Sequence, residues 1–383
     1  MKIAALIFAA VVAVPAGPVF PAQSDRRVVP FTIDDVRPFV PVSVNGKVFH
    51  FLVDTGAAGH NTLALRTARE LGLVRRAAGT MSGANAGALA IESAVVDRFT
   101  MGPIVLRGAT FSVADFAPLE RRIGFRLDGI VASETLIHHR IRFDYPRRVI
   151  VVDPSDTLDA PSVPTRIEGG WPVVEATVDR TRGRFLLDTG DRSYLTLFTP
   201  FATAHYPVPQ RRLRNVTTGY GLVAPIVTDL VRTRLDLGAL HVPELVTRLA
   251  TQQKGGFASD ALAGTIGSGT LLHSVVEIDY RAGSVRIQAA ATQPRSEWDH
   301  AGMWLSRDGD ALLVDGVVPH GPAEEAGLHD GDRLVALNSV PARDVDLPAL
   351  RARLASFKNL VLIVTRRTAT GDEQLSVKLT PLL

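Results

Sequence analysis

Short runs of alternating hydrophobic and polar residues dominate the chain after its N-terminal segment. Alternation with a period of two, rich in β-branched and aromatic residues, is typical of half-buried strands. One stretch has helical spacing instead, and Asn61 or Thr62 can cap its N-terminus, so we predict a helix over 61–71. The clearest predicted strands are 40–44, 49–53, 94–99, 142–145 and 149–152.

The pattern repeats with a period of about 135 residues. Residues 38–56 align with 172–190 without a gap, at an offset of 134. A second block, 129–145, aligns with 264–280 at an offset of 135. Two blocks that keep their order and spacing indicate a duplicated domain, and each copy is expected to be mainly β. A Pro-containing linker, 154–164, joins the copies.

Glycine-rich stretches occur at matching places in both copies. Residues 79–87 and 217–221 combine Gly with small or polar residues, which favours turns because Gly adopts positive φ at little cost. We predict that each forms a hairpin tip. The repeat ends before residue 298, and a third unit follows. Its expected elements are a hairpin, a short helix with a strand, a longer helix and two strands, at 305–318, 321–338, 347–355, 360–365 and 374–379.

The N-terminus has the pattern of a secretory signal. A positively charged start is followed by an uncharged apolar run, 3–14, and then by Pro and Gly residues. The run is shorter than the ~20 residues that span a bilayer, so we predict a signal segment at 1–22, cleaved after Ala16 or Ala22. An uncleaved anchor is the alternative. We expect no later membrane span, and we expect a secreted or periplasmic bacterial protein.

Composition removes several classes of chemistry. The 383 residues contain no Cys, which excludes disulfide scaffolds, Cys-ligated metals and thiol nucleophiles. The net charge of +3 comes from dispersed Arg residues, so we expect no nucleic-acid partner. The ten His have no metal-ligand spacing, and the chain has no Gly-x-Ser-x-Gly motif. We therefore expect no metal and no cofactor, and we also expect a monomer.

The most informative motif is an Asp-Thr-Gly triplet that ends an apolar strand in each copy. Asp54 and Asp188 occupy equivalent positions of the repeat. One triplet alone is an ordinary turn sequence, but duplicated halves usually face each other about a pseudo-two-fold axis, which would bring the two carboxylates together. Adjacent carboxylates share one proton over a wide pH range. The ionised one can then activate a water while the protonated one polarises a peptide carbonyl.

With these residues the sequence resembles the aspartic protease family, specifically its retropepsin-like bacterial members that carry two lobes in one chain. The resemblance covers roughly 28–289 and includes apolar–Gly signatures at 127–131 and 262–266. It implies a mainly β, duplicated, bilobal fold with lobes at 27–155 and 156–290. It also implies a cleft between the lobes for a peptide or protein substrate, closed by flap hairpins.

The same resemblance assigns roles to individual residues. It implies that Asp54 and Asp188 are catalytic, and that Gly83 and Tyr220 belong to the flaps or contact substrate. The residues that would support the catalytic loops are Thr55, Gly56, Thr189 and Gly190.

The second motif departs from the family pattern, because Asp191-Arg192 follows it where a small or hydroxyl residue is usual. If Asp191 points inward, it would raise the pKa of Asp188 or misalign that residue. If Asp191 instead pairs with Arg192 outside the site, little changes.

The third unit, 298–383, resembles a PDZ domain of the bacterial protease type, on the run Gly-Pro-Ala-x-x-Ala-Gly-Leu-x-x-Gly-Asp-x-Leu. The resemblance implies an α+β domain that adds a chain end or an extended segment beside a strand, against the helix at 347–355. The residues expected to bind this peptide are Gly302, Met303, Trp304 and Leu305. The alternative is a domain that packs on the lobes and binds nothing.

Two hypotheses follow. The first is an exported aspartic endopeptidase whose PDZ module binds peptides or regulates cleavage. The second is a non-catalytic peptide-binding or adaptor protein that keeps the protease-like fold. They differ in whether the carboxylates of Asp54 and Asp188 face each other, or whether Asp191 occupies the place between them.

Overall fold

The computed structural model describes residues 26–85, 87–206, 213–290, 296, 298–357 and 359–383. The predicted signal segment at 1–22 lies outside the described residues. The chain divides into two compact units. One comprises Arg27–Glu120 and Phe125–Glu297, and the other comprises Trp298–Leu382, with which Arg121–Gly124 group. Each unit has a hydrophobic core, and the described residues are mainly strand, as the sequence predicted.

The first copy of the repeat forms one sheet, and the strand that comes last in the sequence lies in the middle of that sheet. Its elements are β2 (Thr32–Asp34), β3 (Arg37–Val44), β4 (Lys47–Val53), β5 (Thr62–Ala64), α1 (Leu65–Glu70), β6 (Arg75–Ser82), β7 (Ala88–Met101), β8 (Ile104–Ala114), α2 (Ala117–Ile123), β9 (Gly129–Val131) and α3 (Ser133–Leu136). Among the described residues the strand order is β2-β3-β4-β9-β5-β8-β7-β6, and β3 also pairs with β7.

The second copy has the same arrangement. Its elements are β13 (Thr165–Glu168), β14 (Trp171–Val178), β15 (Thr181–Asp188), β16 (Leu195–Leu197), α4 (Thr199–His205), β17 (Leu213–Tyr220), β18 (Pro225–Leu237), β19 (Leu240–Ala250), a short 3-10 helix (Gly256–Ala258), β20 (Gly264–Gly267) and α5 (Ser268–Leu271). In the described part of the chain, its order β13-β14-β15-β20-β16-β19-β18-β17 matches the first copy strand for strand, which confirms the duplication.

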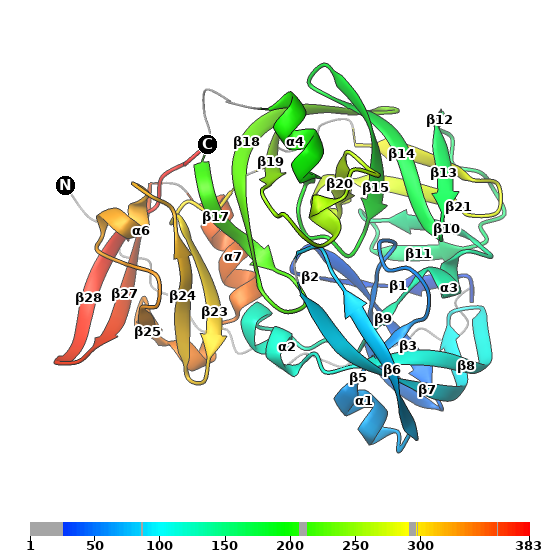
Figure 1. The fold of residues 1–383 in the computed structure, drawn as a ribbon, viewed down its shortest axis with the longest axis horizontal. Helices are drawn as coiled ribbons and strands as arrows, with labels where there is room; N and C mark the ends of the chain where they lie inside the picture. The colour runs from blue at the N-terminus through cyan, green and yellow to red at the C-terminus, as the bar shows by residue number, and fades with distance from the viewer. Residues whose placement is uncertain (1–25, 86, 207–212, 291–295, 297, 358) are drawn as a thin grey trace. The chain divides into compact units, whose positions relative to one another are not determined.

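A third sheet is shared by both lobes (Figure 1). It contains β1 (Val28–Pro30), β10 (Arg140–Asp144), β11 (Val149–Val152), β12 (Ser162–Val163), β21 (Ser274–Asp279) and β22 (Ser284–Ala289). Its order is β1-β11-β10-β21-β22-β12, so the junction between the lobes is the antiparallel pairing of β10 with β21. The predicted linker at 154–164 contributes β12 to this sheet.

The prediction of a helix over 61–71 was wrong in its first part. Residues 62–64 form β5, which is fully buried and pairs with both β8 and β9, and the helix α1 begins only at Leu65. Short apolar runs fit either periodicity, and here the tertiary pairing on both sides favours the strand. The five predicted strands correspond to β3, β4, β7, β10 and β11.

The C-terminal unit is a smaller α+β fold. Its elements are β23 (Met303–Asp308), β24 (Ala311–Val317), α6 (Pro322–Glu325), β25 (Arg333–Leu337), β26 (Val340–Pro341), a 3-10 turn (Ala342–Asp344), α7 (Leu347–Ser356), β27 (Val361–Thr368) and β28 (Gly371–Lys378). Within the described residues the order is β23-β24-β25-β27-β28, with β26 beside β25. The hairpin, both helices and the final strands were all predicted from sequence, and β23 lies at an edge of the sheet.

Candidate active site

Asp54 and Asp188 each lie at the end of a buried strand, β4 or β15. A second strand, β9 in lobe 1 and β20 in lobe 2, pairs in parallel with it and passes this end. Asp54 follows β4, and its N–H donates to the carbonyl of Val131 at 3.0 Å. Asp188 ends β15 and pairs in parallel with Gly267 of β20. The passing strands begin with Gly129 and Gly264, where a Cβ would collide with the backbone carbonyl oxygens of β5 and β16. The apolar–Gly signatures of the sequence therefore have a steric cause.

Thr55 and Thr189 fasten the two loops to each other. The Thr55 N–H donates to the Thr189 hydroxyl at 3.1 Å, and the Thr189 N–H donates to the Thr55 hydroxyl at 3.0 Å. Each hydroxyl in turn donates across the junction at 2.6 Å, to the carbonyl of Leu187 or of Val53. Both threonines are buried. These four bonds hold the ends of β4 and β15 at a fixed separation.

The carboxylates of Asp54 and Asp188 meet between the loops, where one of them can donate to the other when it is protonated. Each is also oriented by its own loop, since Gly56 and Gly190 donate N–H groups to Asp54 Oδ1 and Asp188 Oδ1, both at 2.8 Å. A Cβ on Gly56 would lie 2.5 Å from Asp188 Cγ, and one on Gly190 would collide with the Asp54 carboxylate. Glycine is therefore required at both positions.

The two carboxylates have raised pKa values for related reasons. Burial raises the pKa of Asp54, while the Gly56 N–H, the bond to Asp188 and the charge of Arg37 oppose the shift. The pKa of Asp188 stands well above its ordinary value because of burial, then the charge of Asp54, and then the charge of Asp191. A pair with these properties holds one proton between two acids.

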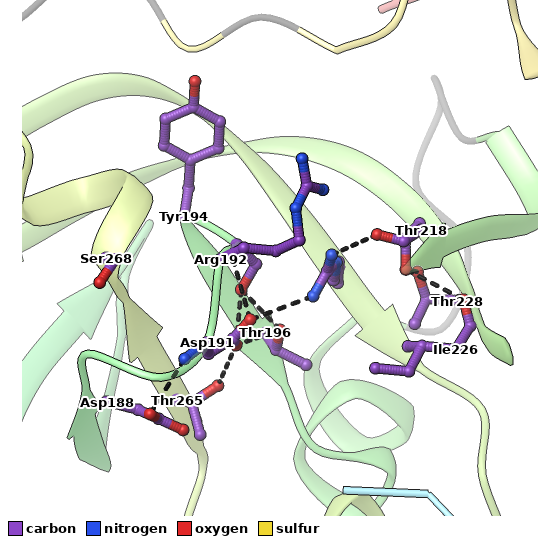
Figure 2. A network of polar contacts seen from close by, with 12 residues as sticks. Asp188, Asp191, Arg192, Tyr194, Thr196, Thr218, Ile226, Thr228, Thr265 and Ser268 are labelled. Atoms are coloured by element: carbon purple, nitrogen blue, oxygen red, sulfur yellow. Dashed lines mark hydrogen bonds and ion pairs between the residues drawn. The ribbon is translucent and has the colours of Figure 1, made fainter. Parts of the chain in front are cut away.

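Asp191 does not occupy the space between the carboxylates. Its backbone N–H donates to Asp188 Oδ1 at 3.0 Å, but its side chain is directed toward lobe 2 (Figure 2). There it accepts the hydroxyl of Ser193 at 2.7 Å, the hydroxyl of Thr265 at 3.0 Å and the guanidinium of Arg248 at 3.2 Å. Burial alone would raise its pKa, but Arg248 and the hydroxyls outweigh burial and hold the pKa below its usual range.

Of the two alternatives for Asp191, neither occurs: it does not enter the space between the carboxylates, and its partner is Arg248 and not Arg192. Figure 2 shows the Arg192 side chain directed away from Asp191. Its Nε lies 3.1 Å from Asp35 Oδ2, and Arg37 Nη2 lies 2.9 Å from the same oxygen. Asp35 and Arg37 come from the hairpin of β2 and β3, so this ion pair joins the lobes. Sequence reasoning missed it, because the partners are far apart in the chain.

The two hairpin tips begin later than predicted, because residues 79–82 belong to β6 and residues 217–220 belong to β17. Gly83 follows β6, and Tyr220 is the last residue of β17. A Cβ on Gly83 would lie 3.2 Å from the side chain of Leu222, so the two tips touch. The Gly83 carbonyl also accepts the N–H of Gly256 at 3.1 Å.

Asn85, which sequence reasoning did not single out, connects the two hairpins. Its buried amide donates to the carbonyls of Ala224 and Pro225 at 2.9 and 3.0 Å. Leu222 packs in the apolar cluster of lobe 1, and Ala84 packs in that of lobe 2. Each tip therefore buries an apolar side chain in the opposite lobe.

In the C-terminal unit, the predicted peptide-binding residues 302–305 lie at the start of the edge strand β23 and are buried. Here backbone N–H groups converge on the half-buried carboxylate of Asp299. Ala301 donates at 2.6 Å, and Gly302 and Met303 also donate. Burial raises the pKa of Asp299 to about 6 against these bonds and the charge of His300. The N–H groups at the start of the expected peptide-binding strand thus bind a carboxylate of their own chain.

The residues that the structure describes include neither a metal cluster nor a membrane-spanning helix. They contain no group of three or more His, Cys, Asp or Glu placed to hold a metal ion. They also contain no helix that is both long and apolar enough to cross a membrane.

Comparison with known families agrees with this geometry. Residues 40–133 match the family model described as aspartyl protease, and residues 313–367 match that of the PDZ domain. No curated protein gave a significant match to the chain. Residues 40–133 therefore form a retropepsin-like aspartyl protease domain, and residues 313–367 form a PDZ domain.

Proposed function

We propose that this protein is an aspartic endopeptidase that hydrolyses peptide bonds with a water activated between Asp54 and Asp188. The observation that carries the proposal is the contact between these carboxylates, fixed by the crossed hydrogen bonds of Thr55 and Thr189. Such a pair keeps one proton at pH values where an isolated carboxylate would have lost it.

The two carboxylates and the water molecule together account for every proton transfer in the reaction. The ionised carboxylate takes a proton from the water as the water oxygen bonds to the peptide carbonyl carbon. The protonated carboxylate gives its proton to the carbonyl oxygen, which produces a gem-diol. The first carboxylate then protonates the nitrogen, the C–N bond breaks, and the second recovers a proton from a gem-diol hydroxyl. The products are an acid and an amine, and the pair returns to its starting protonation.

The non-catalytic alternative would be favoured by carboxylates that diverge or by Asp191 lying between them. The Asp191 side chain bonds to Arg248 and to the hydroxyls of lobe 2 instead, which supports the endopeptidase. We further propose that the PDZ domain binds peptide segments of substrates or regulators, and that the segment at 1–22 directs export to the periplasm or the exterior.

Cleavage of a mixed peptide library from pH 3 to 8 tests the proposal. Asp54→Asn and Asp188→Asn should each abolish cleavage, because each removes one titrating carboxylate. Asp344→Asn, at an exposed site in the PDZ domain, is the control and should cleave like the unsubstituted protein. Cleavage that survives either dyad substitution would refute the two-carboxylate mechanism. Folded protein that cleaves nothing would favour the binding protein.

A further inference from the structure

The two copies of the repeat differ in the residues that pack around the second Asp-Thr-Gly loop. Three residues after Asp54 lobe 1 has Ala57, whereas three residues after Asp188 lobe 2 has Asp191. The pairing registers identify two further exchanges. Thr62 pairs with Ser112 and Leu52 with Ile130, whereas the equivalent Thr196 and Leu186 pair with Arg248 and Thr265. Small or apolar side chains in one lobe are thus replaced by a buried ion pair and a hydroxyl in the other.

We infer that Asp191 is a positioning residue that keeps the shared proton of the dyad on Asp188 and so makes Asp54 the general base. The inference rests on the proposed function. It deepens that function by giving the two catalytic carboxylates different roles, which a symmetric pair would not have.

The contacts of Asp191 keep its side chain ionised and place the negative charge on the Asp188 side of the dyad. Arg248, Ser193 and Thr265 donate to its carboxylate, so the carboxylate stays ionised and cannot rotate toward solvent. Its backbone N–H holds Asp188 Oδ1 at 3.0 Å, which fixes the distance between the two acids. A negative charge this close disfavours ionisation of Asp188. At the equivalent position of lobe 1 stands Ala57, which carries no charge.

The surroundings of Asp54 act in the opposite direction. Arg37, held by Asp35, presents a positive charge that stabilises the ionised form of Asp54. The remaining titratable groups toward the dyad are phenols that stay neutral because burial raises their pKa values. Among the described residues, Arg37, Asp191, Tyr145 and Tyr280 are thus the groups that act on the dyad itself. Asp35, Arg192 and Arg248 act on Arg37 and Asp191 in turn.

The test compares pH profiles of kcat/KM for Asp191→Ala, Arg248→Ser and the double variant that restores the lobe 1 pattern. The fall of kcat/KM at high pH, which is the basic limb of the profile, reports loss of the shared proton. In Asp191→Ala it should move to lower pH by about 1 unit or more, because a negative charge disappears and Arg248 is left unopposed. The double variant removes both charges and should fall between Asp191→Ala and the unsubstituted protein. Arg248→Ser should not move the limb downward.

Asp128→Asn is the matched control, because Asp128 is also an Arg-paired, largely buried carboxylate of the protease unit but does not contact the dyad. Its basic limb should stay in place. Cleavage that requires both Asp54 and Asp188, but has the same basic limb in Asp191→Ala as in the unsubstituted protein, would overturn the inference alone. Cleavage that does not require them would overturn the proposed function.

A second measurement covers the case in which Asp191→Ala does not fold or does not cleave. Carboxyl carbon NMR of the unsubstituted protein follows both acids of the pair directly. Asp188 should keep its proton to higher pH than Asp54. The reverse order would overturn the inference whatever the variants do.

Discussion

Thr55 and Thr189 exchange backbone N–H donors and hydroxyl acceptors across the junction of the lobes, at 3.0 and 3.1 Å. Each hydroxyl also donates to a carbonyl one residue before the opposite catalytic candidate, at 2.6 Å. Both side chains are buried, so water cannot replace a lost partner. The pair therefore stabilises the fold and sets the spacing of the carboxylates at the same time.

Thr55→Val keeps the shape of the side chain but leaves the Thr189 N–H and the Leu187 carbonyl without this hydroxyl. We expect the free energy of unfolding to fall by about 3 kcal/mol, measured by urea unfolding. Thr55→Ser retains the hydroxyl and is the control, with an expected loss of about 1 kcal/mol or less. Equal stability of the two variants would show that the crossed bonds contribute little.

Gly56→Ala places a Cβ against the carboxyl group of Asp188, 2.5 Å from its Cγ before relaxation. The carboxylates must separate to admit it, so we expect peptide cleavage to fall at least ~100-fold, because a 1 Å displacement of a catalytic group has this effect. Gly256→Ala is the control, since its Cβ would have no neighbour closer than 3.6 Å. Full activity of Gly56→Ala would contradict the close approach of the loops.

Asn85→Ala removes the amide that bonds to Ala224 and Pro225. We expect faster hydrogen exchange at Gly221, whose N–H donates within the same hairpin tip, and a higher KM with a smaller change in kcat. Asn85→Asp should have a larger effect, because an ionised carboxylate would face two carbonyl oxygens. Unchanged exchange in both variants would show that the hairpin tips do not depend on this side chain.

The raised pKa of Asp299 predicts a pH-dependent stability of the PDZ domain. Between pH 4 and pH 6 the folded state binds more protons at this residue than the unfolded state, so its contribution falls as pH rises through that window. Asp299→Asn lacks this titration. The stability of Asp299→Asn relative to the unsubstituted protein should therefore increase from pH 4 to 6.5 and then level off, in urea unfolding at several pH values. A constant difference would contradict the assignment.

Asp299 also competes with any terminal carboxylate for the N–H groups of Ala301, Gly302 and Met303. In fluorescence anisotropy, Asp299→Ala should bind a peptide library with free C-termini more tightly than the unsubstituted protein does. The same peptides with amidated C-termini should show no gain. A gain for both sets would mean that the groove, and not the N–H cluster, changed.

The repeat in the sequence predicted the duplicated β architecture well, because residues such as Gly129 and Gly264 are fixed by local sterics and stand at matching positions. It failed at 61–71, where burial between two strands decided the conformation of β5. The position of Asp54 beside Asp188 followed from symmetry.

What symmetry could not predict are the contacts that break it. Asp191 departs from the usual pattern, but its partner Arg248 lies 57 residues later in β19, and no local pattern links the two. The pairing of Asp35 with Arg192 and the amide contacts of Asn85 are equally long-range. A charged residue in the buried part of a strand, such as Arg248 near the end of β19, is the signal that could have prompted the search.

The pairing of β10 with β21 has a consequence for how such a chain can arise and be divided. A polypeptide ending after β11 would possess a complete lobe but would leave the β10 edge unpaired and one Asp-Thr-Gly loop without its partner. Both deficits are relieved by a second copy of the same polypeptide, because β10 and β21 hold equivalent places. In a homodimer of identical copies both loops would carry the same residue three positions after the Asp, whereas two lobes in one chain can carry Ala57 in one loop and Asp191 in the other.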